Sequence, residues 1–211
     1  MYSRFEFRNE LVVSMGFRFA VACLALILIP SALLALGGAF VTFPDSTNEL
    51  PSPDGQFLVR STNYAATTGV FSGKFHALFL EEHRTGKSRK LCDYLGKVAV
   101  SWVAADIIVV NEYYTARGAR ALVFTTNETI STVVIDRNRL VKLLDPITSR
   151  RLLGNDHVYV EAYKLDGNIL SLRLWGYGSQ DAKGFNFSCD YILNRDAATC
   201  WEKSGKPKSV F

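Results

Sequence analysis

The feature that most limits the possible folds of this chain is a run of 23 uncharged residues from Phe19 to Val41. As an α-helix it would extend about 35 Å at ~1.5 Å per residue, enough to cross a hydrocarbon core of ~30 Å. Leu, Ile, Val and Phe supply 12 of its residues, and each favours insertion near the bilayer centre. Pro30 is compatible with a membrane helix, where neighbouring groups can satisfy the freed carbonyl. The sequence therefore predicts one transmembrane helix at residues 19–41.

Charges on either side of this run predict its orientation. Arg4, Arg8 and Arg18 precede it, whereas the segment that follows is mainly acidic. The positive-inside rule then places residues 1–18 in the cytoplasm and the C-terminal part across the membrane. A cleaved signal peptide is the alternative, because small residues at 37–39 offer a cleavage site. We favour an anchor, since the run is longer than the usual apolar core of ~7 to 15 residues.

Composition favours one folded domain after the anchor. Hydrophobic residues make up 48% of the chain and charged residues 21%, a balance typical of a globular protein. The 211 residues leave room for a single core beside the anchor. A net charge of +4 is small, and nucleic-acid-binding proteins usually concentrate much more positive charge on one face. We therefore expect no nucleic-acid partner.

The exported part is predicted to be mostly β. Residues 42–55 are rich in turn formers and indicate a linker, residues 56–202 form the domain, and residues 203–211 are polar enough to be a flexible tail. Segment 136–153 has leucines at helical spacing before Pro146 interrupts them, which predicts one short helical segment. Runs of β-branched and aromatic residues separated by turn formers predict an antiparallel meander in a compact, sandwich-like domain. These runs are 56–61, 74–82, 97–103, 106–112, 120–126, 130–135, 157–164, 168–175 and 184–193.

One stretch of the domain is similar to a known repeat. The turn Ser52-Pro53-Asp54-Gly55 leads into a predicted strand, a second strand and turn follow, and Val100-Ser101-Trp102 precedes a further strand. This succession resembles one blade of the TolB-like and WD40-like β-propellers. About 170 residues without a second Ser-Pro-Asp-Gly cannot supply the four blades that a closed propeller needs, so we expect a blade-like meander only. The loop Ala66-Thr67-Thr68-Gly69 is also similar to small bacterial envelope proteins of unassigned function, which implies a bacterial compartment but no activity. With the predicted anchor and its orientation, we expect the bacterial inner membrane, with the domain in the periplasm.

No catalytic, cofactor or metal signature is recognisable in the sequence, so we assign no residue to these roles. His76, His83 and His157 each lie in or beside a predicted strand, outside any zinc-binding spacing. The glycine-rich segment 175–181 follows a predicted strand, but no helix follows to direct its N-terminal dipole at a phosphate. A turn is therefore the better interpretation.

Four basic residues surround the predicted turn Thr85-Gly86-Lys87. A solvated hairpin tip is the ordinary explanation, and a binding patch for an acidic partner or anionic lipid headgroups is the sharper one. Adjacent Glu81 and Glu82 would weaken the field of such a patch. The four residues are Arg84, Lys87, Arg89 and Lys90.

Cysteine usage predicts one disulfide. Cys23 lies in the predicted membrane span, and Cys92, Cys189 and Cys200 lie in the exported part. In an oxidising compartment two of these three should pair, and Cys189 with Cys200 closes the shortest loop. Cys92 is then expected to remain free and buried as a small hydrophobe.

Two functions remain compatible with these observations. The first is a non-enzymatic protein-binding domain anchored in the membrane, either an accessory subunit of an envelope complex or an immunity protein against a toxin. The alternative is an envelope hydrolase or a glycan-binding module, with aromatic side chains as a platform for sugars. The aromatic residues that suit such a platform are Tyr113, Tyr114, Trp175 and Tyr177.

Overall fold

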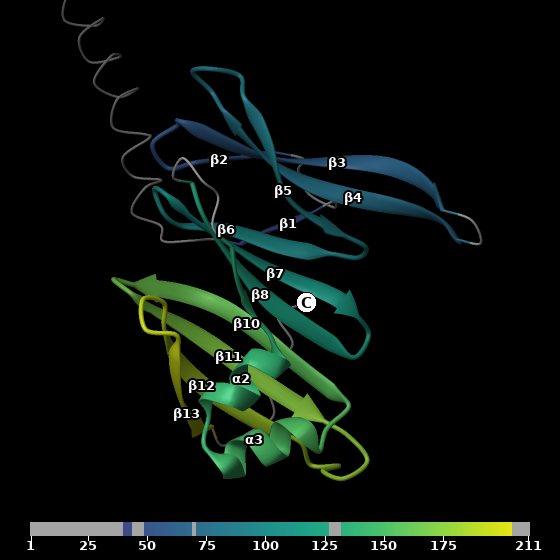
Figure 1. Cartoon of the computed structure of the whole chain (residues 1–211), viewed down its shortest axis with the longest axis vertical. Coiled ribbons are helices and arrows are strands. Elements are labelled where there is room, and N and C mark those ends of the chain that lie inside the picture. Colours follow the sequence, from purple (N-terminus) through teal and green to yellow (C-terminus); the bar gives the residue numbers. More distant parts are fainter. Residues whose placement is uncertain (1–39, 44–48, 69–70, 127–131, 204–211) are drawn as a thin grey trace, which may run out of the picture. The chain divides into compact units, whose positions relative to one another are not determined.

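A computed structural model describes residues 40–43, 49–68, 71–126 and 132–203, including their side chains except for 64–68 and 71–75 (Figure 1). In this part the chain consists mainly of strands in antiparallel sheets, with two helices. The prediction of a mostly β fold is therefore confirmed. Residues 1–39, which contain most of the predicted membrane span, lie outside the described part, and Val41 at its end belongs to a strand. None of the described helices is long and apolar enough to cross a membrane.

The smaller sheet is a four-stranded antiparallel meander. Its first hairpin is entered through the predicted turn at residues 52–55, where Gly55 has a φ of +70°. The hydroxyl of Ser52 accepts a hydrogen bond from the Phe57 amide at 2.9 Å, and the Asp54 carboxylate accepts one from the Gln56 amide at 3.0 Å. These side chains therefore add to the backbone bonds that close the turn, from the Ser52 amide to the Phe57 carbonyl at 2.8 Å and from the Gly55 amide to the Ser52 carbonyl at 3.0 Å. The strands, in spatial order, are β2 (Glu49–Pro51), β3 (Phe57–Thr68), β4 (Phe71–Glu82) and β5 (Ser88–Tyr94).

The larger sheet joins two further meanders. β8 and β10 connect them through a short parallel pairing of Val158 with Gly118 and Tyr159 with Ala119. Its strand order is β1-β6-β7-β8-β10-β11-β12-β13, and β9 also pairs with β8. The first group comprises β1 (Val41–Phe43), β6 (Val98–Ala104), β7 (Ile107–Thr115), β8 (Gly118–Thr125) and β9 (Thr132–Ile135). The second group comprises β10 (His157–Asp166), β11 (Ile169–Tyr177), β12 (Phe185–Ile192) and β13 (Ala197–Glu202).

Two helices, not one helical segment, lie between these groups. They are α2 (Arg137–Leu143) and α3 (Pro146–Leu153). The Asp136 carboxylate caps α2 by accepting from the Arg139 amide at 2.8 Å, and Asp145 caps α3. Pro146 does not interrupt a helix but begins one, because the first helical position needs no N–H donor.

Two hydrophobic cores hold these layers together. One core lies between the smaller sheet and β6–β8, and includes Val59, Leu80 and Trp102. The other lies between the opposite face of β6–β9, the two helices and one face of β10–β13, and includes Leu140 and Leu172. The strands β6, β7 and β8 are therefore buried on both faces, which explains their nearly continuous apolar runs.

Four strands fall outside the runs identified in the sequence. β1 overlaps the start of the predicted linker 42–55 and β2 lies within it, so parts of that segment belong to the two sheets. β5 carries charged residues, and β13 carries small ones. Each of the four ends a strand order, and an edge strand is under less pressure than a central one to be apolar.

Candidate functional site

The predicted basic patch lies on the hairpin between β4 and β5, but it is partly neutralised. The Arg84 side chain lies 3.7 Å from a carboxylate oxygen of Glu82, and Lys90 lies 2.9 Å from Asp93. Arg89 points elsewhere and donates to the carbonyl of Thr126 at 3.5 Å. The remaining member, Lys87, is exposed. The hairpin therefore presents interspersed charges of both signs, which suits a solvated tip.

The predicted cysteine pair lies at disulfide distance. Cys189 on β12 is directly opposite Cys200 on β13, and their sulfur atoms are 1.95 Å apart. The turn between the strands includes Asp196 at a φ of +48°. Cys92, on the edge strand β5, is the free cysteine of the described residues.

The three histidines form no common site. His76 stacks on Tyr94 at 5.0 Å between ring centroids and bonds to Asn63, His83 is exposed near the β4–β5 turn, and His157 begins β10. Within the described part of the chain, no group of three or more His, Cys, Asp or Glu side chains could hold a metal ion.

A row of stacked side chains crosses the outer face of β10 and β11. The pairs His157–Tyr177 and Tyr159–Trp175 are directly opposite in the register, with ring centroids 4.4 and 5.1 Å apart. Tyr159 also approaches Tyr177 at 6.5 Å, and the guanidinium of Arg173 lies 4.9 Å from the Trp175 ring centroid. These five residues, which we call the aromatic ladder, therefore form one continuous stack.

The ladder lies on the open face of its sheet. The neighbours of its residues along each strand, such as Val158 and Leu174, point to the opposite face and belong to a hydrophobic core. No member of the ladder belongs to either core, and Tyr177 is 47% exposed. On the same face, Trp201 of β13 is also 47% exposed. Two large aromatic side chains, Tyr177 and Trp201, are therefore exposed on a sheet face outside both cores, whereas the other four members of the ladder are partly buried.

Two hydrogen bonds hold side chains in the ladder and beside it. The Tyr159 hydroxyl donates to the Ala116 carbonyl at 2.7 Å, and the Tyr113 hydroxyl donates to the carboxylate of Glu161, which is only 7% exposed. Burial raises the pKa of Glu161, while the Tyr113 hydroxyl and the charge of Arg173 act in the opposite direction. Burial is the main cause that raises the pKa of Tyr159 to about 12, and the neighbouring Tyr177 adds to it. This phenol is therefore neutral at physiological pH. These contacts restrict the motion of the ladder before any ligand binds.

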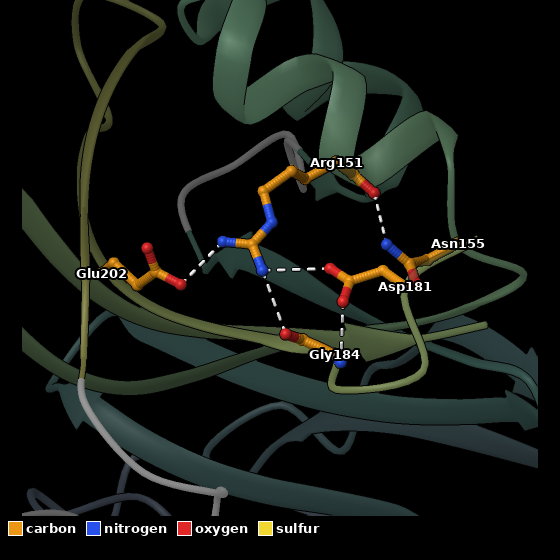
Figure 2. Close-up of polar contacts among 5 residues, drawn as sticks. All are labelled: Arg151, Asn155, Asp181, Gly184 and Glu202. Carbon is orange, nitrogen blue, oxygen red and sulfur yellow. Dashed lines mark hydrogen bonds and ion pairs between the residues drawn. The ribbon is translucent and has the colours of Figure 1, made fainter. Parts of the chain in front are cut away.

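The opposite face of the same sheet carries an arginine clamp from α3 (Figure 2). The guanidinium of Arg151 donates to Glu202 of β13 at 2.6 Å, to Asp181 at 3.0 Å and to the carbonyl of Gly184 at 3.0 Å. It also lies 5.6 Å from the ring centroid of Phe187. Every contact is internal, so the clamp joins the helix to the sheet. It also occupies Asp181 of the glycine-rich segment, which precedes β12 and not a helix.

Two of the four aromatic residues predicted as a platform lie in the ladder, namely Trp175 and Tyr177. Tyr114 lies elsewhere, beside Arg120. The Tyr113 hydroxyl bonds to Glu161, which lies opposite Arg173 in the register of β10 and β11. Alternation of aromatic residues at positions 157, 159, 175 and 177 was the signal available for the whole row.

Comparison with models of protein families, with curated proteins and with solved structures found no match for this chain.

Proposed function

We propose that this chain is a membrane-anchored, non-enzymatic domain that binds another protein in the bacterial periplasm through the aromatic ladder. Accessory subunits of envelope complexes and immunity proteins are the classes of protein that combine these properties. We propose the anchor because of the apolar run before the domain, and we infer the side of the membrane from the charges around that run.

The open aromatic ladder is the observation that carries the proposal. Trp, Tyr and Arg dominate the residues that contribute most to protein–protein binding, and the ladder consists of these types together with one histidine. Its side chains are already held in place by their neighbours and by the Tyr159 hydroxyl bond. Little side-chain entropy is therefore lost when a partner covers them.

Ring orientation favours a protein over a glycan as the ligand. A sugar binds an aromatic side chain by lying flat against an open ring face. In the ladder, His157 and Tyr177 are nearly parallel, with 9° between their planes, and Tyr159 and Trp175 make an angle of 15°. These rings cover one another's faces, so a ligand meets mainly their edges and the apolar surface between them.

Site-specific photo-crosslinking in the cells that produce the chain tests this proposal. A benzophenone amino acid replaces Tyr177 in one variant and Ile147 in a matched control, because Ile147 is an apolar residue of α3 that is 78% exposed. We expect a covalent adduct of one discrete mass from position 177 and none from position 147. Arg173→Glu should greatly reduce that adduct while leaving the Cys189–Cys200 bond intact, which reports on folding.

Two results would contradict the proposal. Identical adducts from both positions would indicate non-specific contacts, and an adduct at position 177 that contains carbohydrate and no protein would favour the glycan-binding module. The anchor is tested separately, because a mature N-terminus near residue 40 would show that the apolar run is a cleaved signal.

A further inference from the structure

Five strands of the described residues pair along one side only, and four of them are protected against pairing with another strand. β9, which pairs only with β8, has four residues. β1 and β2 have three residues each, and β2 contains Pro51, which has no backbone N–H. β5 carries Arg89 and Lys90. Short strands, proline and basic side chains are the usual means by which proteins prevent association at sheet edges.

The fifth, β13, has no such protection. It has six residues, Ala-Ala-Thr-Cys-Trp-Glu, without proline or a basic side chain. The single charged side chain, Glu202, is turned to Arg151 at 2.6 Å. The bond between Cys189 and Cys200 joins β13 covalently to β12 and restricts fraying. An edge that is long, unprotected and fastened in place is suited to pairing with another strand.

The register of β12 and β13 shows which backbone groups face away from the sheet. The Lys203 amide donates to the Asn186 carbonyl at 2.7 Å, which makes these two residues a hydrogen-bonded pair. Because such pairs alternate along an antiparallel ladder, Thr199 and Trp201 also bond inward. The N–H and C=O groups of the intervening residues of β13 therefore point outward. These intervening residues are Ala198, Cys200 and Glu202.

We propose that β13 pairs antiparallel with β13 of a second copy of this chain, about a two-fold axis at Cys200. In this register each of the three outward residues pairs with an outward residue of the second copy: Ala198 faces Glu202, and Cys200 faces its equivalent. Any other two-fold register leaves at least one outward residue without such a partner. It forms six backbone hydrogen bonds, counted from one donor and one acceptor on each outward residue. The proposal concerns the edge of the sheet and is independent of what binds the aromatic ladder.

Side chains at this edge complement one another under the two-fold operation. Trp201 lies beside Thr199 of the second copy in a narrow, non-hydrogen-bonded pair, and aromatic residues pair favourably with β-branched residues at such positions. The contact occurs twice, as an isologous interface requires. Glu202 faces the methyl group of Ala198, and its carboxylate is already occupied by Arg151 of its own chain. No like charges face each other across the axis.

Amide hydrogen exchange with single-residue resolution, combined with the molecular mass of the full chain in detergent, tests the proposal. Amides of Thr199, Trp201 and Lys203 should be protected at every concentration, because they bond to β12. Amides of Ala198, Cys200 and Glu202 should become protected only at concentrations where the mass is that of two copies. This alternation would not arise from an interface elsewhere on the molecule.

Two variants separate pairing from folding. Ala198→Pro removes an outward N–H from each copy and keeps every bond to β12, since proline is tolerated on the open side of an edge strand. It should weaken the dimer at least about tenfold, as expected for two lost hydrogen bonds. Trp201→Lys places a lysine on the exposed side of the edge and should do the same, whereas Ile147→Lys, on α3, should not.

Each other outcome overturns the inference. A monomer with rapid exchange at all three outward amides would show that the edge is unpaired. Protection of these amides in a monomer would show that another segment or another protein occupies it. A dimer that survives both Ala198→Pro and Trp201→Lys, with the inward amides still protected, would place the interface elsewhere. None of these results depends on the crosslinking at Tyr177.

Discussion

Removal of the Arg151 clamp is the sharpest test of how α3 is held on the sheet. Arg151→Ala deletes the donors to Glu202, Asp181 and the Gly184 carbonyl, together with the contact to Phe187. Hydrogen bonds to charged groups contribute ~1.5 to 3 kcal/mol when buried. The side chains here are partly exposed, at 30% for Arg151, 25% for Asp181 and 57% for Glu202, so each ion pair is limited to ~1 kcal/mol or less.

The sum of these contacts sets the expected magnitude. The two ion pairs, the carbonyl bond and a partly buried cation–π contact of ~0.5 to 1 kcal/mol give a loss of about 2 kcal/mol in the free energy of unfolding. Asp181 keeps one partner, the Gly184 amide at 3.1 Å, so its carboxylate is not left without a donor. Arg151→Lys retains the charge but cannot bond to both carboxylates at once, and should lose about half as much.

Urea unfolding in non-ionic detergent, followed by tryptophan fluorescence, measures this loss without adding salt. A difference of ~2 kcal/mol shifts the midpoint by roughly 1 M for a slope of ~2 kcal/mol per M. Arg150→Ala is the matched control, because Arg150 is the exposed neighbour of Arg151 on the same helix. If Arg151→Ala and Arg150→Ala shift the midpoint equally, the clamp contributes nothing to stability and our argument is wrong.

Three further predictions concern the cysteines and one acidic residue. Mass spectrometry of the unreduced chain should show a peptide cross-link between Cys189 and Cys200. Its reduction should lower the free energy of unfolding by about 3 kcal/mol in the chain-entropy model. Burial, with a smaller effect of Glu112, raises the pKa of the Cys92 thiol to about 12, so iodoacetamide at pH 8 should modify it only after unfolding; rapid alkylation of the folded chain would refute this. The Tyr191 hydroxyl, followed by Arg139, lowers the pKa of Asp196. The pKa of Asp196 in the folded chain is therefore below its unfolded value of ~3.9. The charged carboxylate stabilises the fold at any pH above the unfolded pKa, and this contribution disappears as the pH falls through the folded pKa. Asp196→Asn should therefore lower the free energy of unfolding by up to ~1 kcal/mol at pH 7 and leave it unchanged in strong acid. Urea unfolding at both pH values measures this difference, and an equal loss at both would contradict the argument.

Strand content could be predicted from the sequence because local patterns carry it. In β10 and β11, residues that point into the core alternate with residues that point away, as between Val158 and Tyr159. The turn at residues 52–55 is also recognisable, since the side chains of Ser52 and Asp54 bond to backbone amides within a few positions. Pro146 begins α3 and does not interrupt a helix, and the sequence could not show this because a proline ends a helix from an interior position but begins one from the first position.

The aromatic ladder could be anticipated only in part. Trp175 and Tyr177 stand out in the sequence, but their stacking partners His157 and Tyr159 lie on another strand. A shift of β10 by one residue against β11 would place His157 and Tyr159 on the opposite face from Trp175 and Tyr177. No local pattern specifies that register between strands, so the sequence alone could not show that four rings form one row.

By itself, the sequence determined the uncharged run from Phe19 to Val41, the β-rich character of the remaining chain and the two cysteines closest to each other after that run. Each depends on residues near one another along the chain. Only the tertiary structure decided that Arg151 reaches Glu202, that β13 is an edge, and that the ladder lies on the uncovered face. These properties arise from contacts between residues distant in sequence, where packing of both cores selects one strand order and one register.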